Sequence, residues 1–460
     1  MNFFFNPRGI AVIGATPDPL KGGYNILKNI VTGYQGGIYP VNPKYTEIEG
    51  LACYDSVQAI PDPVDLAIVF VPAQIAVKAV AACARHGIKG VMIQSAGFAE
   101  TGPMGRSLQD ELLEIRNKTG LRIWGPNCMG LVDAVNRRLF SFVLPAMWDY
   151  GMQPGNVSLI VQSGMLSAGF LIDTVSHGTM GISKACSIGN KADVDECDIL
   201  EYLIQDPDTS AIGAYLESIT DGRRFLNACK STQKPIVVLK GGKSAKGAGA
   251  AMSHTSSLAG NADIISGALA QAHVTEADDF KQMLDFCRTR AAYSHVRHKS
   301  KGRTAVLTFS GGAGIVSADF IDQMGLELAD LSSRTLQRLA DVFPSWMPPS
   351  NPVDMWPAIE KNGPEKVYHT AFEAVCNDPG VDAVLFHVFI GGIIANLDIS
   401  SLVDIARKHD KPLFVWLLGK RDEAFAFQQI IQSLGVPVYR ELQRAVQCMS
   451  ALFGARLKRR

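Results

Sequence analysis

Short apolar segments alternate with helix-length amphipathic segments along most of the 460-residue chain, and this alternation restricts the fold more than any other feature. An apolar run of about four to eight residues is typical of a strand that is buried on both faces. Strands of this kind, each followed by a helix, form a parallel sheet with helices on both faces. The sequence therefore predicts an α/β protein built from parallel sheets.

The first third of the chain has the pattern of a Rossmann-like domain. We expect strands at 10–13, 37–41, 65–70, 90–93 and 121–124, and helices at 22–32, 74–86 and 106–118. Ligands of such sheets bind beyond the C-terminal ends of the strands. The turns at that edge contain Gly14, Asn42-Pro43-Lys44, Val71-Pro72, Ser95 to Phe98 and the segment GPNCMG at 125–130.

The first turn lacks the dinucleotide fingerprint. It reads GATPDPLKGG instead of GxGxxG, and Lys44 follows the second strand where a carboxylate would bind the ribose of NAD. A lysine there disfavours NAD and favours a ligand with an additional phosphate, such as coenzyme A. Ordinary βα turns are the alternative, and Cys128 is equally compatible with a packing thiol and with a neighbour of a bound thiol ligand.

The remaining two thirds contain a repeat. A strand at 156–161 leads to Ser163-Gly164 and a helix, and a strand at 304–308 leads to Ser310-Gly311-Gly312 and a helix. Further strands are expected at 182–187, 211–216, 235–240, 382–388, 412–417 and 436–439. With boundaries at the Pro/Gly-rich passage 145–155 and the polar passage 294–302, we expect a Rossmann-like domain at 1–145 and two flavodoxin-like domains at 152–294 and 302–460.

A Ser-Gly turn that opens a helix exposes backbone amides and the positive end of the helix dipole, which favours an anion. Ser163, Gly164, Ser310, Gly311 and Gly312 are therefore candidate phosphate-binding residues, although such turns are often only helix caps. Two of them in tandem domains would be able to hold two sides of one phosphoryl group.

Between the two turns lies the loop 241–260, GGKSAKGAGAAMSHTSSLAG, with His254 in its middle. An imidazole among glycine amides and lysines is suited to nucleophilic attack on phosphorus; an incidental polar histidine is the alternative. Glu217 follows the strand 211–216, where a carboxylate could fix the tautomer of the imidazole or cap the next helix. Gly242-Lys243-Ser244 is not the end of a P-loop, because the first glycine of that motif would fall at Val237.

Composition narrows the class of partner and the compartment. Lys and Arg together number 44, as do Asp and Glu, which disfavours a nucleic-acid partner or an anionic membrane surface. The nine cysteines are scattered without a CxxC pair, which favours reduced thiols and disfavours a zinc site. Neither a signal peptide nor an apolar run of about 20 residues is present, so we expect a cytoplasmic protein without a membrane span.

Several motifs occur along nearly the whole chain in an ordered series: VIGAT, IYPVNPK, VDLAIVFVPA, SAGFAETG, GPNCMG, VQSGMLSAG, IGNKADVD, YLESITDGRRF, SHTSSLAG, FSGGAG and NPVD. In this order the sequence resembles the α subunit of NDP-forming acyl-CoA synthetases, which are relatives of succinyl-CoA synthetase. The series is highly specific, whereas any single motif in it is weak.

The resemblance implies roles for individual residues. His254 matches the histidine that is phosphorylated during turnover, Glu217 matches the glutamate that orients it, and the two Ser-Gly turns match helix starts near the phosphohistidine. Ser256 stands where the family has the glycine of SHTG, which bears on loop geometry and turnover because serine lacks glycine's freedom of φ. The residues expected to bind CoA are Gly14, Ala15, Thr16, Lys21, Lys44, Val71, Pro72, Ser95, Ala96, Gly97, Asn127 and Cys128.

The implied reaction converts a small carboxylic acid, CoA and ATP to acyl-CoA, ADP and phosphate through an acyl phosphate and a phosphohistidine. Three domains already account for the chain, so ATP and Mg²⁺ are expected on a separate ATP-grasp β subunit, in a heteromer of the α2β2 type, and no metal is expected on this chain. A non-catalytic regulatory protein that binds CoA or acyl-CoA is the rival hypothesis, and a NAD-dependent redox protein is a third, more distant one.

Overall fold

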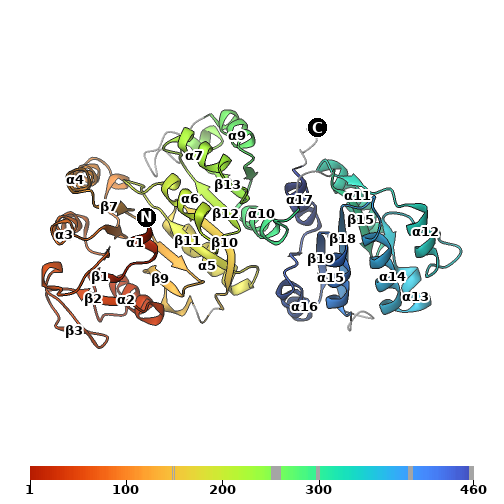
Figure 1. Ribbon diagram of the computed structural model, residues 1–460, viewed down its shortest axis with the longest axis horizontal. Coiled ribbons are helices and arrows are strands. Elements are labelled where there is room, and N and C mark those ends of the chain that lie inside the picture. Colours follow the sequence, from red (N-terminus) through yellow and green to blue (C-terminus); the bar gives the residue numbers. More distant parts are fainter. Residues whose placement is uncertain (148, 150, 250–260, 297–300, 392–396, 455–460) are drawn as a thin grey trace. The chain divides into compact units, whose positions relative to one another are not determined.

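Contacts between residues divide the chain into two units, Met1–Cys287 and Arg288–Arg460. The coordinates are a computed structural model that describes all residues except 148, 150, 250–260, 297–300, 392–396 and 455–460 (Figure 1). Each unit is described by itself. Within the described residues, no helix is long and apolar enough to cross a membrane.

The first unit begins with a five-stranded parallel sheet in the order β2-β1-β5-β6-β7. The strands are β1 (Gly9–Ile13), β2 (Gly37–Val41), β5 (Leu66–Val69), β6 (Gly90–Ile93) and β7 (Arg122–Trp124). The helices are α1 (Asn2–Phe5), α2 (Gly22–Gly33), α3 (Ala73–Arg85) and α4 (Pro103–Thr119), and a small hairpin joins β3 (Glu47–Ile48) to β4 (Leu51–Ala52). After β2 the chain crosses to the other side of β1 and enters β5, so the gap between β1 and β5 is the switch point, where ligands of such sheets bind.

The two faces of this sheet are covered differently. Helices α3 and α4 cover one face (Figure 1). Their residues Val80 and Leu112 share a buried cluster with Ala11, Val69 and Val91 of the strands. On the other face α2 packs against the strand β9 (Arg138–Ser141), which belongs to the next sheet. One buried cluster accordingly extends from the first sheet into the second.

The second sheet has the order β14-β13-β12-β10-β11-β8-β9. Its strands are β8 (Gly130–Asp133), β9, β10 (Pro154–Val161), β11 (Ile182–Ser187), β12 (Ala211–Leu216), β13 (Ile236–Lys240) and β14 (Thr275–Ala277). Its helices are α5 (Gly164–His177), α6 (Glu196–Gln205), α7 (Gly222–Lys230), α9 (Ala262–Gln271) and α10 (Phe280–Ala292). Strands β10 to β14 pair in parallel in the flavodoxin-like order, with the switch point between β10 and β12.

The antiparallel hairpin of β8 and β9 extends this second sheet, because β8 pairs with β11. Its residues lie in the range that we assigned to the first domain, so hydrogen bonds cross the predicted boundary. The division into domains at 1–145 and 152–294 stays a prediction, while the alternation of parallel strands and helices is confirmed to within a few residues at the element ends.

The second unit contains a six-stranded parallel sheet in the order β16-β15-β18-β19-β20, with β17 also pairing with β15. Its strands are β15 (Arg303–Thr308), β16 (Glu327–Leu328), β17 (Val353–Asp354), β18 (Ala383–Ile390), β19 (Leu413–Gly419) and β20 (Val438–Tyr439). Its helices are α11 (Gly311–Gln323), α12 (Ser333–Ala340), α13 (Trp356–Asn362), α14 (Pro364–Cys376), α15 (Ile399–Lys408), α16 (Arg421–Ser433) and α17 (Leu442–Phe453). Leaving β17 aside, the strand order is again flavodoxin-like, which confirms the repeat.

Local sequence explains where many helices begin and end. Helix α4 starts with Pro103 in its first turn and ends at Gly120, whose φ of 76° is the left-handed conformation that glycine favours. Helix α6 starts with a capping box, in which the Asp195 side chain accepts from backbone N–H groups and the Asp198 side chain accepts in return. Because the α/β strands of each sheet pair in parallel, the loops that follow their C-terminal ends lie at one edge of the sheet.

Candidate functional site

The first candidate edge lies at the switch point of the first sheet, where Gly14 follows β1. Its N–H donates to the Val41 carbonyl at 3.0 Å, and its φ is 93°. A Cβ at Gly14 would lie 2.4 Å from the Phe70 carbonyl oxygen and 2.8 Å from Cγ1 of Val71. Only glycine allows the turns after β1 and β5 to approach this closely, so Gly14 and Val71 are brought together.

Hydrogen bonds join the other turns at the same edge. The Asn42 side chain donates to the Ala15 carbonyl at 2.7 Å, which ties the turn after β2 to that after β1. The Ser95 hydroxyl accepts from the Val71 N–H at 3.0 Å, and the Ser95 carbonyl accepts from the Asn127 N–H at 3.0 Å. The turns that the sequence predicted for CoA therefore form one continuous edge.

The polar side chains of this edge differ in their exposure to solvent. Thr16 is buried and its hydroxyl accepts from the Asp18 N–H at 3.3 Å. Lys21 is exposed and pairs with Asp18 at 3.3 Å, and Lys44 is exposed at the start of the loop after β2. Pro72 and Ala96 are exposed and Gly97 is half-buried. An anion approaching this edge would therefore meet two lysines at its rim.

Cys128 is the one thiol among the residues predicted for this edge, and its side chain is only 1% exposed. Its thiol lies 3.3 Å from the Ile93 carbonyl oxygen, and burial raises the pKa of the thiol to about 12. At neutral pH it is therefore a protonated packing group.

The second candidate edge lies at the switch point between β10 and β12. Ser163 is the N-cap of α5, and its side chain makes no capping hydrogen bond. The first intrahelical bond runs from Ser167 to the Ser163 carbonyl, so the amides of Gly164 and the next two residues have no partner within the helix. Free amides at the positive end of a helix dipole favour an anion, and the phosphate-binding role of Ser163 and Gly164 stays a prediction.

Glu217 lies beside this turn and is buried. The Gln162 side chain accepts from the N–H groups of Glu217 at 2.8 Å and Ser218 at 3.1 Å, which fixes the end of β12 against the end of β10. The Tyr215 hydroxyl donates to Oε1 of Glu217 at 3.3 Å. The N-cap of the following helix is Asp221, which accepts from the Arg224 N–H at 2.9 Å. The capping role considered for Glu217 therefore belongs to Asp221.

The loop that carries His254 begins directly at this edge. The ammonium group of Lys240 donates to the carbonyl oxygens of Glu217 at 2.6 Å and Gly241 at 2.5 Å, and burial lowers its pKa. His254 and Ser256 lie outside the described residues, so the contact between Glu217 and His254 stays a prediction. Sequence reasoning missed Gln162 and Lys240, although both are polar residues at the ends of apolar strands.

The second Ser-Gly turn lies in the second unit. Ser310 is the N-cap of α11 without a side-chain capping bond. A Cβ at Gly311 would lie 3.1 Å from a carboxylate oxygen of Asp354, the last residue of β17. The Asp354 carboxylate therefore faces the positive end of helix α11. The NPVD motif contains Asp354, but the sequence did not predict this position. That Ser310, Gly311 and Gly312 hold a phosphoryl group jointly with Ser163 and Gly164 stays a prediction.

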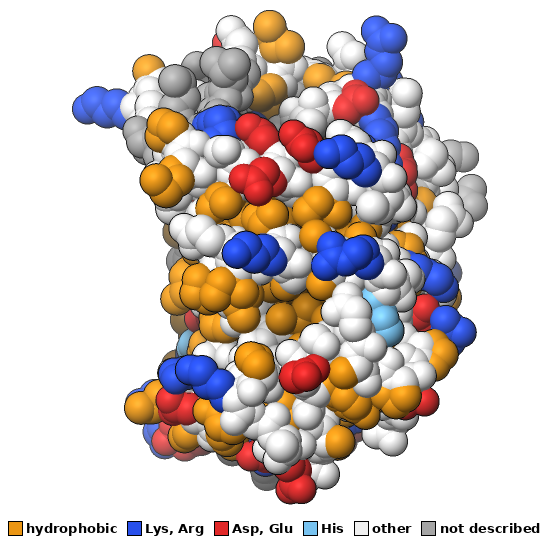
Figure 2. Space-filling view, turned by 90° about the vertical axis from the view of Figure 1, so that its left-hand side faces the viewer, with side chains coloured by type: hydrophobic (Ala, Val, Ile, Leu, Met, Phe, Trp, Pro, Cys, Tyr) orange, Lys and Arg blue, Asp and Glu red, His pale blue; other side chains and the backbone are white. Residues whose placement is uncertain are grey.

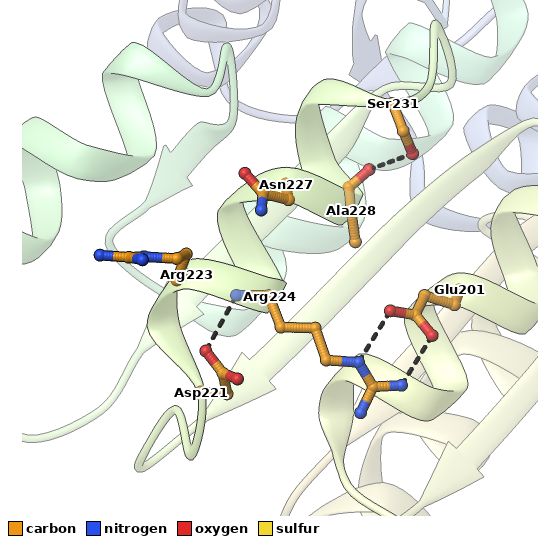
Figure 3. A pocket seen from close by; sticks show the side chains of 7 residues that line it. All are labelled: Glu201, Asp221, Arg223, Arg224, Asn227, Ala228 and Ser231. Carbon is orange, nitrogen blue, oxygen red and sulfur yellow. Dashed lines mark hydrogen bonds and ion pairs between the residues drawn. The ribbon is translucent and has the colours of Figure 1, made fainter.

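A surface pocket of about 570 Å³ lies between α6 and α7 (Figure 3). Its lining residues are Glu201, Asp221, Arg223, Arg224, Asn227, Ala228 and Ser231. Arg224 already pairs with Glu201 at 2.6 Å and with Asp198 at 2.7 Å. The charge of Arg224 is therefore compensated within the protein. None of the residues that the sequence predicted for catalysis, phosphate binding or CoA binding lines this pocket.

Neither the surface charge nor the metal-ligating side chains of the first unit, where the structure describes them, indicate a further site. The face of the first unit in Figure 2 mixes basic, acidic and apolar side chains without a large field of one sign. Among the described residues, no group of three or more His, Cys, Asp or Glu side chains is arranged to hold a metal ion.

Comparison with known families agrees with the geometry. The CoA binding domain family matches residues 8–134, and the succinyl-CoA ligase-like flavodoxin domain family matches residues 154–290. The fold and the two edges thus define an α/β protein with a CoA-binding domain followed by a succinyl-CoA ligase-like domain.

Relatives that match most of the chain assign it to a family within this class. The chain is 42% identical to the acetate–CoA ligase (ADP-forming) II subunit alpha of Pyrococcus furiosus, over 84% of this chain and 81% of the relative. It is 35% identical to the corresponding ligase I subunit alpha, over 98% of this chain and 96% of the relative. The chain therefore belongs to the ADP-forming acyl-CoA ligase family, and the resemblance inferred from the sequence is confirmed.

A solved structure and a longer relative add two facts. An acetyl-CoA synthetase of Ca. Korarchaeum cryptofilum, determined with phosphate and ADP, matches with a TM-score of 0.88 and 31% identity, over 98% of this chain and 96% of that chain. The acetate–CoA ligase (ADP-forming) II of Archaeoglobus fulgidus is 37% identical over 97% of this chain, but the match covers only 65% of the relative. The chain thus spans about two thirds of this longer relative.

Proposed function

We propose that the chain is the α subunit of an ADP-forming acyl-CoA synthetase, which converts a small carboxylic acid, CoA and ATP to acyl-CoA, ADP and phosphate. The observation that supports this most directly is the match to a relative named as an α subunit over 96% of that relative's length. The rival regulatory function is not favoured, because relatives such as the acetate–CoA and 4-hydroxybutyrate–CoA ligases are named as enzymes.

In the proposed reaction, Nε2 or Nδ1 of His254 receives a phosphoryl group from ATP, and ADP leaves. The carboxylate of the acid then attacks this phosphorus, which regenerates the imidazole and forms an acyl phosphate. The CoA sulfur attacks the acyl carbon, the C–S bond forms as the C–O bond to phosphate breaks, and the thiol proton is released. Glu217 would hold the imidazole tautomer, and the α5 amides beyond Ser163 would stabilise charge on the phosphoryl oxygens.

Nucleotide and metal belong to a second protein in this proposal. We expect ATP and Mg²⁺ on an ATP-grasp β subunit, in a heteromer of the α2β2 type, and CoA on the first edge of this chain. Lys21 and Lys44, both exposed at that edge, are suited to the phosphates of CoA. The domain division at 1–145, 152–294 and 302–460 and a cytoplasmic location belong to the same proposal.

The decisive experiment traces the phosphoryl group. The purified chain with its ATP-grasp partner is incubated with γ-labelled ATP, and the label is located by mass spectrometry. We expect acid-labile label on His254, none in His254→Ala, and release of the label as phosphate when a carboxylate and CoA are added together. Acyl-CoA formation without label on His254 would refute the mechanism, whereas label on His254 that carboxylate and CoA together do not release would refute the assigned reaction.

A further inference from the structure

The loop at residues 188–193, between β11 and α6, contacts both candidate edges of the first unit. Two consecutive residues in it make contacts in different directions. Asn190 hydrogen-bonds to residues of the first edge, whereas Lys191 contacts the segment that follows Glu217. The GPNCMG turn lies between these contacts, and a Cβ at Gly164 would lie 3.5 Å from the Met129 backbone nitrogen.

Asn190 connects two turns that the proposed function assigns to CoA. Its amide nitrogen donates to Glu100 at 2.5 Å and to Gln109 at 3.1 Å. Its amide oxygen accepts from the Asn127 side chain at 3.3 Å. Every polar atom of this side chain is therefore engaged, which fixes its orientation.

Glu100 transmits this contact to the turn after β6. Its other carboxylate oxygen accepts from the N–H groups of Gly97 at 2.7 Å and Phe98 at 3.1 Å. Burial opposes ionisation of Glu100, but the hydrogen bonds from Asn190 and from these amides outweigh it and lower the pKa of the carboxyl. A charged acceptor of this kind makes the hydrogen bond from Asn190 stronger than one between neutral groups.

Lys191 fixes the opposite edge. Its ammonium group pairs with Glu196 at 2.7 Å, with both side chains at most 4% exposed, and donates to the Ser218 carbonyl at 2.9 Å. The other Glu196 oxygen accepts from the Thr220 N–H at 2.6 Å. The buried pair therefore holds the segment directly after Glu217.

The backbone of the loop has little freedom to shift. Gly189 has a φ of 57°, and a Cβ there would lie 2.2 Å from the Pro126 carbonyl oxygen. The N–H groups of Asn190 and Ala192 donate to the carbonyls of Pro126 and Gly125, each at 2.9 Å. The backbone of the loop is therefore fixed to the GPNCMG turn, and loss of one side-chain contact leaves the contacts to the other edge in place.

We propose that Asn190 and Lys191 are positioning residues that hold the CoA edge at a fixed distance from the phosphoryl edge, so that the CoA sulfur reaches the acyl phosphate. Asn190 acts through Glu100 and Asn127, and Lys191 acts through Glu196 and Ser218. The inference rests on the proposed function, since it assigns these residues to the thiol-transfer step. A misplacement of about 1 Å between reacting groups can cost about a hundredfold in rate.

The test first replaces the Asn190 amide by a carboxylate and then replaces the Glu100 carboxylate by an amide as well. Asn190→Asp places two carboxylates at the 2.5 Å contact with Glu100, and we expect the KM for CoA and the Kd for CoA of the chain alone to rise about tenfold. Labelling of His254 by ATP and the partner subunit should change by less than about twofold, because the Lys191 contacts remain. The double variant Glu100→Gln/Asn190→Asp restores a donor–acceptor pair and should recover most CoA affinity.

Asn227→Asp on the exposed side of α7 is the matched control, and thermal denaturation checks that each variant is folded. An unchanged CoA affinity in folded Asn190→Asp would overturn the inference, as would equal loss of CoA affinity and His254 labelling. Failure of the double variant to recover would overturn it as well. If the wild-type chain binds CoA but forms no acyl-CoA from any carboxylate with its partner, the proposed function fails, and the CoA titrations still decide whether Asn190 positions the CoA edge.

Discussion

The side-chain oxygen of Gln162 accepts a hydrogen bond from the N–H of Glu217 at 2.8 Å, across the switch point between β10 and β12. The same oxygen accepts from Ser218 at 3.1 Å. Two loops that would otherwise be independent are thereby fixed to one another at the place where the proposed phosphohistidine chemistry occurs. A single uncharged side chain thus sets the position of the carboxylate that would orient His254.

Gln162→Ala is therefore expected to lower both stability and phosphorylation. It leaves two N–H groups without their acceptor, which costs about 1–3 kcal/mol for each group that stays buried. We expect the rate of His254 labelling by ATP and the partner subunit to fall more than about tenfold. Gln162→Glu keeps the acceptor and should retain more stability in urea denaturation; equal labelling rates for Gln162→Ala and the wild type would contradict this role.

Gly14→Ala tests the close approach of the first two turns at the CoA edge. The added Cβ would meet the Phe70 carbonyl oxygen at 2.4 Å and would also strain a backbone at φ 93°. Gly102→Ala is the matched control, because Gly102 has a φ of 100° but a Cβ there would meet no atom within 4 Å. We expect a loss of about 1 kcal/mol for Gly102→Ala from strain alone, and of about 3 kcal/mol or more for Gly14→Ala. Similar losses in urea denaturation would show that contact with Phe70 is unimportant.

The sequence was sufficient to predict the longer parallel strands and the turns at their ends, because apolar runs followed by Gly, Ser or Pro have a strong local signature. It did not predict the strands of two or three residues β3, β4, β14, β16 and β17. It did not predict the hairpin of β8 and β9, since its edge pairing with β11 depends on residues distant in the chain. Gln162 and Asp354 were missed for the same reason. Each acquires its role from a neighbour on another strand or loop, and no spacing in the sequence records that proximity.

Alkylation should distinguish the cysteines by burial. Cys53 is half-buried, whereas the other eight cysteines, including Cys128, are buried. Burial raises the pKa of Cys128 to about 12, so almost no thiolate is present at about pH 8. In the folded chain, iodoacetamide should modify Cys53 first and leave Cys128 unmodified, as judged by mass spectrometry of peptides. Early modification of Cys128 would instead indicate that its turn opens readily in solution.

His387 should make the stability of the chain depend on pH. It is fully buried on β18, between the hydroxyls of Ser317 at 3.0 Å and Thr308 at 2.9 Å. Burial lowers the pKa of its imidazole to about 3, while the unfolded chain keeps a value near 6.5. Between these values the unfolded state binds a proton that the folded state does not. The contribution to stability is therefore complete above about pH 6.5 and is lost progressively as the pH falls toward 3.

At about pH 5 this single group is expected to cost about 2 kcal/mol relative to about pH 7.5. In His387→Gln, which keeps an amide between Thr308 and Ser317 but does not titrate, the decrease in unfolding free energy over the same pH interval should be smaller by that amount. Urea denaturation of the full chain at several pH values provides the measurement, and the other histidines and carboxylates cancel in the comparison. Parallel pH profiles for the two proteins would mean that the imidazole becomes protonated within the fold, and the bonds to Thr308 and Ser317 would then have to rearrange.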